Sequence, residues 1–233
     1  MSLSRRRFLE MSAAAAGATL AGCRDRRTAE TLMAIGRANA SVEAALFRHT
    51  AMNHPGAGAG TSGLAFPQYY ISQAPPVWDD ATLGPWRLEV TGAVRRPLRL
   101  SLEDLMRMRQ TAQKVDHFCV EGWNARAVWR GVRLADLARL ADLTSDAGFV
   151  DFVSFDSGYH ESWDIESALH PQTLIATVKD GAYLGAGYGG PARVHSPVKL
   201  GYKNTKYLTR IVFQPAANGG YWSDRGYEWY GGT

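Results

Sequence analysis

The 233-residue sequence predicts an α+β fold that is built on a mixed sheet. Hydrophobic residues make up 45% of the chain and aromatic residues 11%, which is enough for the core of one domain. Segments that alternate between apolar and polar residues outnumber segments with helical periodicity. The helical segments fall between the strands at irregular intervals, which does not fit a repeated strand–helix–strand unit.

The first 23 residues have the features of an export signal. Ser4-Arg5-Arg6-Arg7-Phe8-Leu9 is followed by an alanine-rich run over residues 11–22. A basic start before a short apolar run is typical of a secretory signal, and the arginine pair indicates the twin-arginine route. The run is shorter than the roughly 20 residues that a spanning helix needs. We therefore expect a periplasmic protein; a basic helix start is the alternative interpretation.

The end of this signal resembles the lipobox of bacterial lipoproteins. The residues are Leu20-Ala21-Gly22-Cys23, and we expect a lipid anchor at Cys23, with plain cleavage as the alternative. Residues 28–49 have helical spacing, and residues 53–63 are rich in glycine. Residues 24–63 are therefore expected to be a helix and a linker ahead of a domain over residues 64–233.

The secondary structure of residues 64–233 follows from their periodicity. The expected strands are residues 86–92, 98–100, 111–115, 149–155, 192–194 and 207–213, and the expected helices are residues 101–108, 134–140 and 164–169. Ser101 is expected to cap the first of these helices. Residues 174–184 are expected to form a hairpin around Asp180-Gly181. Gly122 and Trp129-Arg130-Gly131 are interpreted as turn and loop.

Cys119 is the one thiol left for the folded domain, because the chain has two cysteines and the other is Cys23. It follows a predicted strand and precedes a turn, so its sulfur can face a cleft. Asp116, His117 and Glu121 surround it with polar groups, which suits a site better than a core. A thiolate can ligate a soft metal or attack an electrophile. An inert buried cysteine is the alternative.

A basic cluster lies near the C-terminus of the domain. It consists of Arg193, Lys199, Lys203 and Lys206, and it suits an anionic, phosphate-bearing ligand. Solvated charges along a strand edge are the alternative interpretation. The net charge of the whole chain is +4, which is too small to indicate binding to nucleic acid.

Other candidate residues have weaker support. His117 could form a nucleophile–base pair with Cys119, although no third residue to orient the pair is evident. Three histidines lack the spacing of metal ligands and are interpreted as satisfied loop or core residues: His160, His170 and His195. Four aromatic residues are candidates to line a substrate mouth or to pack in the core: Trp123, Tyr159, Trp163 and Trp222.

Several of these segments together resemble the sulfite oxidase superfamily. Cys119-Val120-Glu121-Gly122-Trp123 and residues 129–134 are similar to the signature around the molybdenum-ligating cysteine of that family. Gly190-Pro191-Ala192-Arg193 and residues 201–211 are similar to the signature around its pterin phosphate. The resemblance runs from residue 66 to the end. It is greatest to the bacterial periplasmic molybdopterin oxidoreductases, a branch that includes the catalytic subunit of a methionine sulfoxide reductase.

The resemblance implies a sulfite-oxidase-type α+β domain that binds a molybdenum–molybdopterin cofactor. Cys119 would be the catalytic residue, supplying its thiolate to molybdenum, and Arg193 and Lys206 would bind the terminal phosphate. Ser154 falls where the family has a threonine that contacts the cofactor, and Tyr70 falls near the pterin entrance. The complete expected set is Tyr70, Cys119, Ser154, Arg193, Asn204 and Thr205 (both through backbone groups) and Lys206.

The sequence also departs from the family pattern. Pro67 and Gln68 stand where the family often has asparagine, and Tyr188 replaces an asparagine or histidine. Ser72 and Asn124 occupy positions where sulfite oxidases have arginines around an anion pocket. The chain ends before an appended Ig-like dimerisation domain. We therefore expect a monomer that is not a sulfite oxidase proper.

These observations predict a periplasmic molybdopterin oxidoreductase. It would transfer an oxygen atom or two electrons to or from a small S- or N-oxide-type substrate. The Cys-x-x-Cys-His haem motif is absent, so a membrane cytochrome or a c-type cytochrome is the expected electron partner. Two alternatives remain, a metal-free thiol enzyme that uses Cys119 and His117 and a non-catalytic lipoprotein that serves as a binding module.

Overall fold

The computed structural model describes residues 66–156 and 158–233, together with scattered residues between 31 and 45. Two compact units are distinguished, Met1–Glu43 and Ala44–Thr233, and all strands lie in the second. The residues described between 31 and 45 are helical. The expected export signal, Cys23 and the glycine-rich linker lie outside the described residues. Within the described part of the chain, no helix has the length and apolar character needed to cross a bilayer.

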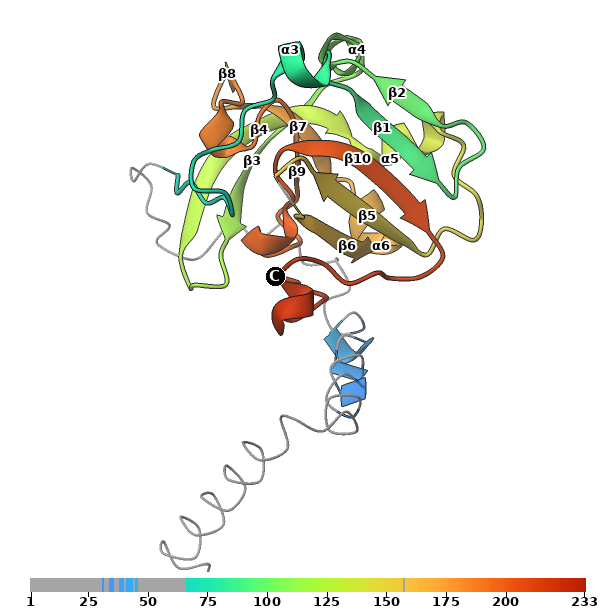
Figure 1. Cartoon of the computed structure of the whole chain (residues 1–233). Helices are drawn as coiled ribbons and strands as arrows, with labels where there is room; N and C mark the ends of the chain where they lie inside the picture. Colours follow the sequence, from blue (N-terminus) through green and yellow to red (C-terminus); the bar gives the residue numbers. More distant parts are fainter. Residues whose placement is uncertain are drawn as a thin grey trace, which may run out of the picture. The chain divides into compact units, whose positions relative to one another are not determined.

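The first sheet has the strand order β2-β1-β10-β5-β6. Its strands are β1 (Leu88–Gly92), β2 (Leu98–Leu100), β5 (Phe149–Ser154), β6 (His160–Asp164) and β10 (Leu208–Gln214). β1 is parallel to β10, and the other neighbours are antiparallel, so the sheet is mixed as predicted. Figure 1 shows β10, in red, between β1 and β5. β6 was not predicted, because two of its five residues are the buried polar residues Glu161 and Ser162.

A second sheet is entirely antiparallel and has the order β3-β4-β7-β8, with β9 also paired to β7. Its strands are β3 (Thr111–Phe118), β4 (Asn124–Arg133), β7 (Leu174–Lys179), β8 (Ala182–Tyr183) and β9 (Arg193–His195). The predicted hairpin is confirmed, since Asp180 and Gly181 both have positive φ, at 50° and 85°, between β7 and β8. The division into two sheets was not anticipated.

The described helices of the second unit are short, and three of the four α-helices begin at a capping side chain. They are α3 (Asp80–Leu83), α4 (Leu102–Arg107), α5 (Leu134–Leu140) and α6 (Ile165–Leu169), with 3₁₀ helices η1 (Ala186–Tyr188), η2 (Gly201–Lys203) and η3 (Ser223–Arg225). The predicted cap at Ser101 is confirmed, since its Oγ accepts a hydrogen bond from the Asp104 amide at 3.0 Å. The Asp104 carboxylate accepts one from the Ser101 amide at 2.9 Å, which completes a capping box.

The prediction of a loop at Trp129-Arg130-Gly131 is wrong, because these residues lie inside β4. A bulge separates Arg130 from Gly131 where β4 pairs with β7. A Cβ atom at Gly131 would lie 2.0 Å from the Ile175 carbonyl oxygen. The glycine therefore permits a close approach of two strand backbones, which is a second use of glycine besides turns.

Two hydrophobic clusters fill the domain. The larger includes residues of both sheets and of α4, α5 and α6, and Trp163 lies in it with no exposed surface. The smaller consists of Phe66, Ala125, Ala127, Trp129, Leu174, Ala176 and Leu184. Ala125, Ala127 and Trp129 are two residues apart on β4 and so face the same side. This face packs against Phe66, whose ring lies 5.5 Å from Trp129 and 5.1 Å from His117.

Candidate active site

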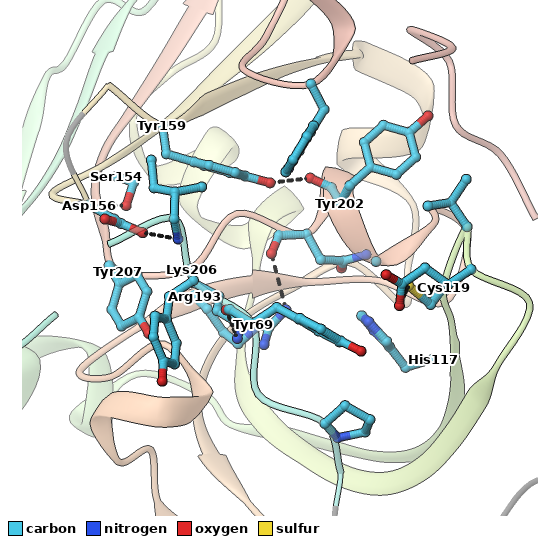
Figure 2. Close-up of a pocket in the computed structure, with 18 of the residues that line it drawn as sticks. Tyr69, His117, Cys119, Ser154, Asp156, Tyr159, Arg193, Tyr202, Lys206 and Tyr207 are labelled. Atoms are coloured by element: carbon cyan, nitrogen blue, oxygen red, sulfur yellow. Dashed lines mark hydrogen bonds between the residues drawn. The ribbon is translucent and has the colours of Figure 1, made fainter. Parts of the chain in front are cut away.

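A cavity of about 310 Å³ lies between the turn after β3, the end of β5, the segment of residues 66–71 and the stretch around η2. This volume falls in the range of small-molecule sites. Its wall is formed by Phe66, Pro67, Tyr69, Tyr70, Ile71, His117, Cys119, Val120, Glu121, Trp123, Ser154, Asp156, Tyr159, Arg193, Gly201, Tyr202, Asn204, Lys206, Tyr207, Trp222 and Tyr227. Figure 2 shows Cys119 and His117 toward one side of this pocket and Lys206 toward the other.

The cavity brings together most of the residues expected to contact the cofactor. Six of the seven line it: Tyr70, Cys119, Ser154, Arg193, Asn204 and Lys206. Thr205 does not. It is completely buried, and its hydroxyl oxygen has no hydrogen-bond partner among the described residues. The contacts of each residue with the cofactor remain predictions.

A tight turn holds Cys119 at the cavity wall. β3 ends at Phe118, and the amide of Cys119 donates to the Trp123 carbonyl at 2.9 Å. The Gly122 amide donates back to the Cys119 carbonyl at 3.0 Å, and Gly122 has a φ of 85°. Glycine adopts this left-handed conformation without the steric cost that other residues bear. The predicted turn at Gly122 is therefore confirmed.

The electrostatics around Cys119 disfavour a thiolate–imidazolium pair. Burial raises the pKa of the Cys119 thiol above its ordinary 9.0, and the nearby carboxylate of Glu121 raises it further. Burial, followed by the charges of Arg193 and Lys206, lowers the pKa of His117 to about 3. A proton would have to move from a thiol whose pKa is raised to an imidazole whose pKa is about 3, which is unfavourable. A nucleophilic Cys119 activated by His117 is therefore not supported.

Two cations on the cavity wall, the buried Arg193 and the half-buried Lys206, form no ion pair with any described acid. Arg193 is 1% exposed, and it forms no ion pair with any described residue. It donates to three backbone carbonyls, those of Tyr188, Val194 and Asn204. Lys206 Nζ donates to the carbonyls of Gly187, at 3.2 Å, and Tyr69. Unpaired cations are costly to bury, so this arrangement suits an anion that would neutralise them.

Lys199 and Lys203 do not belong to this anion site, so the predicted cluster of four basic residues is wrong. Lys203 Nζ lies 2.7 Å from Glu161 Oε2, and both side chains are fully buried. Lys199 Nζ lies 2.9 Å from Asp164 Oδ2 and is 1% exposed, so neither lysine is a solvated charge on a strand edge. These pairs could not be predicted from the sequence, because both acids lie on β6, far from the two lysines along the chain.

Lys206→Met is expected to remove a pH dependence from the stability of the cofactor-free protein. Burial and the charge of Arg193 lower the pKa of Lys206 from 10.5 to about 7. Between these two values the unfolded chain binds more protons than the folded one, so stability rises with pH. The full cost of burying the charged form of Lys206 is present below pH 7. From pH 7 to about 9, the wild type should gain about 1–2 kcal/mol relative to the variant, after allowance for solvent screening. Urea unfolding of both proteins measures this difference, and parallel pH profiles would contradict it.

Asp156 holds the segment of residues 66–71 at the cavity wall through hydrogen bonds, a role that was not predicted from the sequence. Its carboxylate accepts hydrogen bonds from the Ile71 amide, at 3.1 Å, and from the Ser72 hydroxyl. Its own amide donates to Ser154 Oγ at 2.8 Å. The end of β5 thereby positions the segment that carries Tyr69 and Tyr70.

The C-terminal segment also contributes to the wall. Trp222 and Tyr227 line the cavity, and the Trp222 amide donates to Glu161 Oε1 at 2.9 Å. The Tyr159 hydroxyl donates to the Tyr202 carbonyl, which is drawn as a dashed line in Figure 2. Three of the four aromatic candidates therefore line the pocket, namely Trp123, Tyr159 and Trp222. Trp163 is a core residue instead.

The remaining histidines do not form a metal site. His160 Nδ1 lies 2.9 Å from Asp151 Oδ1, and His170 Nδ1 accepts from the Gln172 amide at 3.2 Å. His195 is fully buried against Trp129, with ring centroids 4.1 Å apart. Both of its ring nitrogens lack a partner among the described residues, so the prediction that it is satisfied is wrong. No group of three His, Cys, Asp or Glu residues in the described ranges could hold a metal by itself.

The chemistry of the cavity fits a molybdopterin cofactor. Cys119 offers one sulfur donor, which is a suitable ligand for a soft transition metal that is otherwise held by the cofactor. The unpaired charges of Arg193 and Lys206 fit a phosphate, since a guanidinium and an ammonium are its usual partners. The fit rests on these two cations, because neither forms an ion pair with an acid in the described part of the chain. Burial lowers the pKa of Lys206, and the charge of Asp156 offsets only part of that lowering.

Comparisons with known proteins agree with this chemistry. Residues 74–222 match the family described as "Oxidoreductase molybdopterin binding domain". The "Putative protein-methionine-sulfoxide reductase subunit YedZ1" of Azospira oryzae is 37% identical over 99% of this chain and 88% of its own length. The "Protein-methionine-sulfoxide reductase catalytic subunit MsrP" of Gluconobacter oxydans is 31% identical over 76% of this chain and 65% of its own length.

A solved structure shares the fold. The sulfane dehydrogenase SoxCD from Paracoccus pantotrophus aligns with a TM-score of 0.54 and 22% identity, over 57% of this chain and 39% of that chain. The predicted α+β molybdopterin-binding fold of the sulfite oxidase type is thereby confirmed, and so are the predicted molybdopterin cofactor and oxidoreductase class. This chain therefore belongs to the family of oxidoreductases with a molybdopterin-binding domain.

Proposed function

We propose that this protein is an exported reductase that uses molybdopterin to remove the oxygen atom of a sulfoxide such as methionine sulfoxide. The observation that carries the proposal is the placement of one sulfur donor, Cys119, and two unpaired cations, Arg193 and Lys206, on the wall of one cavity. The names of the relatives support the choice of sulfoxide among possible oxides.

Each part of the wall has a distinct task in this proposal. When bound, the cofactor supplies a two-electron redox couple and exchanges an oxygen atom with the substrate. Cys119 holds the metal end, and Arg193 and Lys206 hold the phosphate end. His117, with a pKa of about 3, stays neutral and adds no further positive charge between them. Phe66 packs against His117, with ring centroids 5.1 Å apart.

The aromatic side chains near Cys119 favour an uncharged substrate with an alkyl group. Tyr69 and Trp123 stack with ring centroids 6.0 Å apart, and both line the cavity with Trp222. Aromatic rings of this kind provide apolar contact area for a thioether carbon chain. No arginine other than the buried Arg193 lines the described cavity, so a sulfite-like anion has little to bind near Cys119.

The proposal includes periplasmic location, export by the twin-arginine route and a lipid anchor at Cys23. The support is the signal-like sequence of residues 1–23. Electrons would come from a membrane or c-type cytochrome, and a membrane subunit is favoured because the relatives are named as subunits. We also propose that the sulfoxide is either a small molecule or part of a protein, and that the enzyme is a monomer.

The test is a substrate screen on protein purified from a host that makes the cofactor. Reduced benzyl viologen would be the electron donor, with methionine sulfoxide, dimethyl sulfoxide and trimethylamine N-oxide as acceptors. We expect sulfoxide-dependent dye oxidation in the ordinary range of about 1–1,000 s⁻¹. Sulfite oxidation with ferricyanide, measured in parallel, should be slow. Fast sulfite oxidation without sulfoxide reduction would contradict the proposal, and equal activity in metal-free protein would favour the thiol enzyme.

A further inference from the structure

A carboxylate stands at the mouth of the cavity beside the cysteine. Glu121 belongs to the turn between β3 and β4, and one of its oxygens lies 3.8 Å from Cys119 Sγ. The same oxygen accepts a hydrogen bond from Trp123 Nε1 at 2.9 Å. A hydrogen bond to this carboxylate, together with its charge, raises the pKa of Tyr69, the ring that stacks on Trp123. Glu121 therefore lies between Cys119 and two aromatic side chains.

The charges on the cavity wall are divided between its two ends. The charged residues that line it are Glu121, Asp156, Arg193 and Lys206. Asp156 is 3% exposed and is occupied by the Ile71 amide and the Ser72 hydroxyl. Arg193 and Lys206 lie on the side away from Cys119 (Figure 2). Among the charged residues that line the cavity, the one beside Cys119 is therefore the acid Glu121.

The geometry points to Glu121 as a specificity-determining residue that admits uncharged sulfoxides and excludes anionic substrates; this inference rests on the proposed function. A substrate that reaches Cys119 comes within a few ångströms of this carboxylate. Two like charges about 4 Å apart repel each other even in water, and more strongly where solvent is partly excluded. The positively polarised sulfur of a sulfoxide is not repelled, and its alkyl groups can contact the rings of Tyr69 and Trp123.

Two substrates of nearly the same shape test this inference. N-acetyl-methionine sulfoxide carries one negative charge, and its carboxamide carries none. The wild-type holoenzyme is expected to prefer the amide by about fivefold in kcat/KM, the factor that corresponds to two unit charges about 4 Å apart in water. The preference should lie in KM, because the charge acts on binding and the reacting sulfoxide is the same.

Glu121→Gln is the informative variant. The glutamine carbonyl can still accept the hydrogen bond from Trp123, and the side chain is exposed, so the fold and the turn should persist. The preference for the amide should fall to near one, through a lower KM for the anion. Glu121→Lys should reverse the preference. Glu103→Gln is the matched control, because it removes the same charge from an exposed position on α4 whose ion pair is with Arg107, outside the cavity.

A binding measurement tests the role of Glu121 independently of turnover. The corresponding sulfones carry the same charges, and calorimetric titration of the holoenzyme should give the same ratio of dissociation constants as the ratio of KM values. A preference that is equal in wild type, Glu121→Gln and Glu121→Lys overturns the role of Glu121 while sulfoxide reduction stands. Failure of the wild type to reduce either sulfoxide refutes the proposed function and this inference together.

Discussion

Replacing Cys119 with serine is expected to lower sulfoxide turnover by at least about 100-fold, since changes to groups that merely support a metal ligand already cost up to that factor. A hydroxyl is a harder and less acidic donor than a thiol, so serine is a poor substitute for a thiolate on a soft metal. The rest of the fold should not change, because Cys119 lies in a turn at the cavity wall and not in either hydrophobic cluster. Dye-linked turnover, metal content and the paramagnetic resonance signal of the half-reduced metal are the measurements.

An exposed valine outside the cavity provides the control for this variant. Val128 on β4 is 37% exposed and does not line the cavity, so Val128→Ser introduces the same hydroxyl away from the site. That variant should keep wild-type turnover and the wild-type resonance signal. If Cys119→Ser retained both at full metal loading, Cys119 would not be the metal ligand.

Arg193→Met and Lys203→Met are expected to have different effects, although the two buried cations are only ten residues apart in the sequence. Lys203→Met leaves Glu161 buried without its partner and should lower the free energy of unfolding by about 3–5 kcal/mol. Arg193→Met leaves no acid unpaired. The relief of a buried charge offsets part of the three lost hydrogen bonds to carbonyls, so stability should fall much less. The loss should instead appear in bound cofactor.

Denaturant unfolding of the cofactor-free proteins and the pterin content of protein from a cofactor-making host measure the two effects. Glu161→Gln combined with Lys203→Met is the control, because it removes the orphaned charge and should recover part of the lost stability. If Arg193→Met were as unstable as Lys203→Met and still bound the cofactor, Arg193 would not be a ligand of the phosphate.

The sequence was most informative where a local rule decides the structure. The cap at Ser101, the hairpin at Asp180-Gly181 and the turn at Gly122 depend on residues within four positions of each other, and each is confirmed. Gly131 shows the limit of such rules. The residues Trp129-Arg130-Gly131 indicated a loop. The backbone of Ile175 on β7, more than forty residues away, instead requires a glycine at this position inside β4.

The same distinction between local and long-range information applies to the cavity. By itself the sequence determined the fold class, the family and the identity of Cys119, Arg193 and Lys206 as candidates, because these follow from short motifs and from a count of cysteines. Only the tertiary structure decided which cations stay unpaired, which aromatic residues reach the mouth and where Glu121 stands relative to Cys119. The physical reason is that charge pairing and burial depend on distances in space, and β6 supplies acids to Lys199 and Lys203 but none to Arg193 or Lys206.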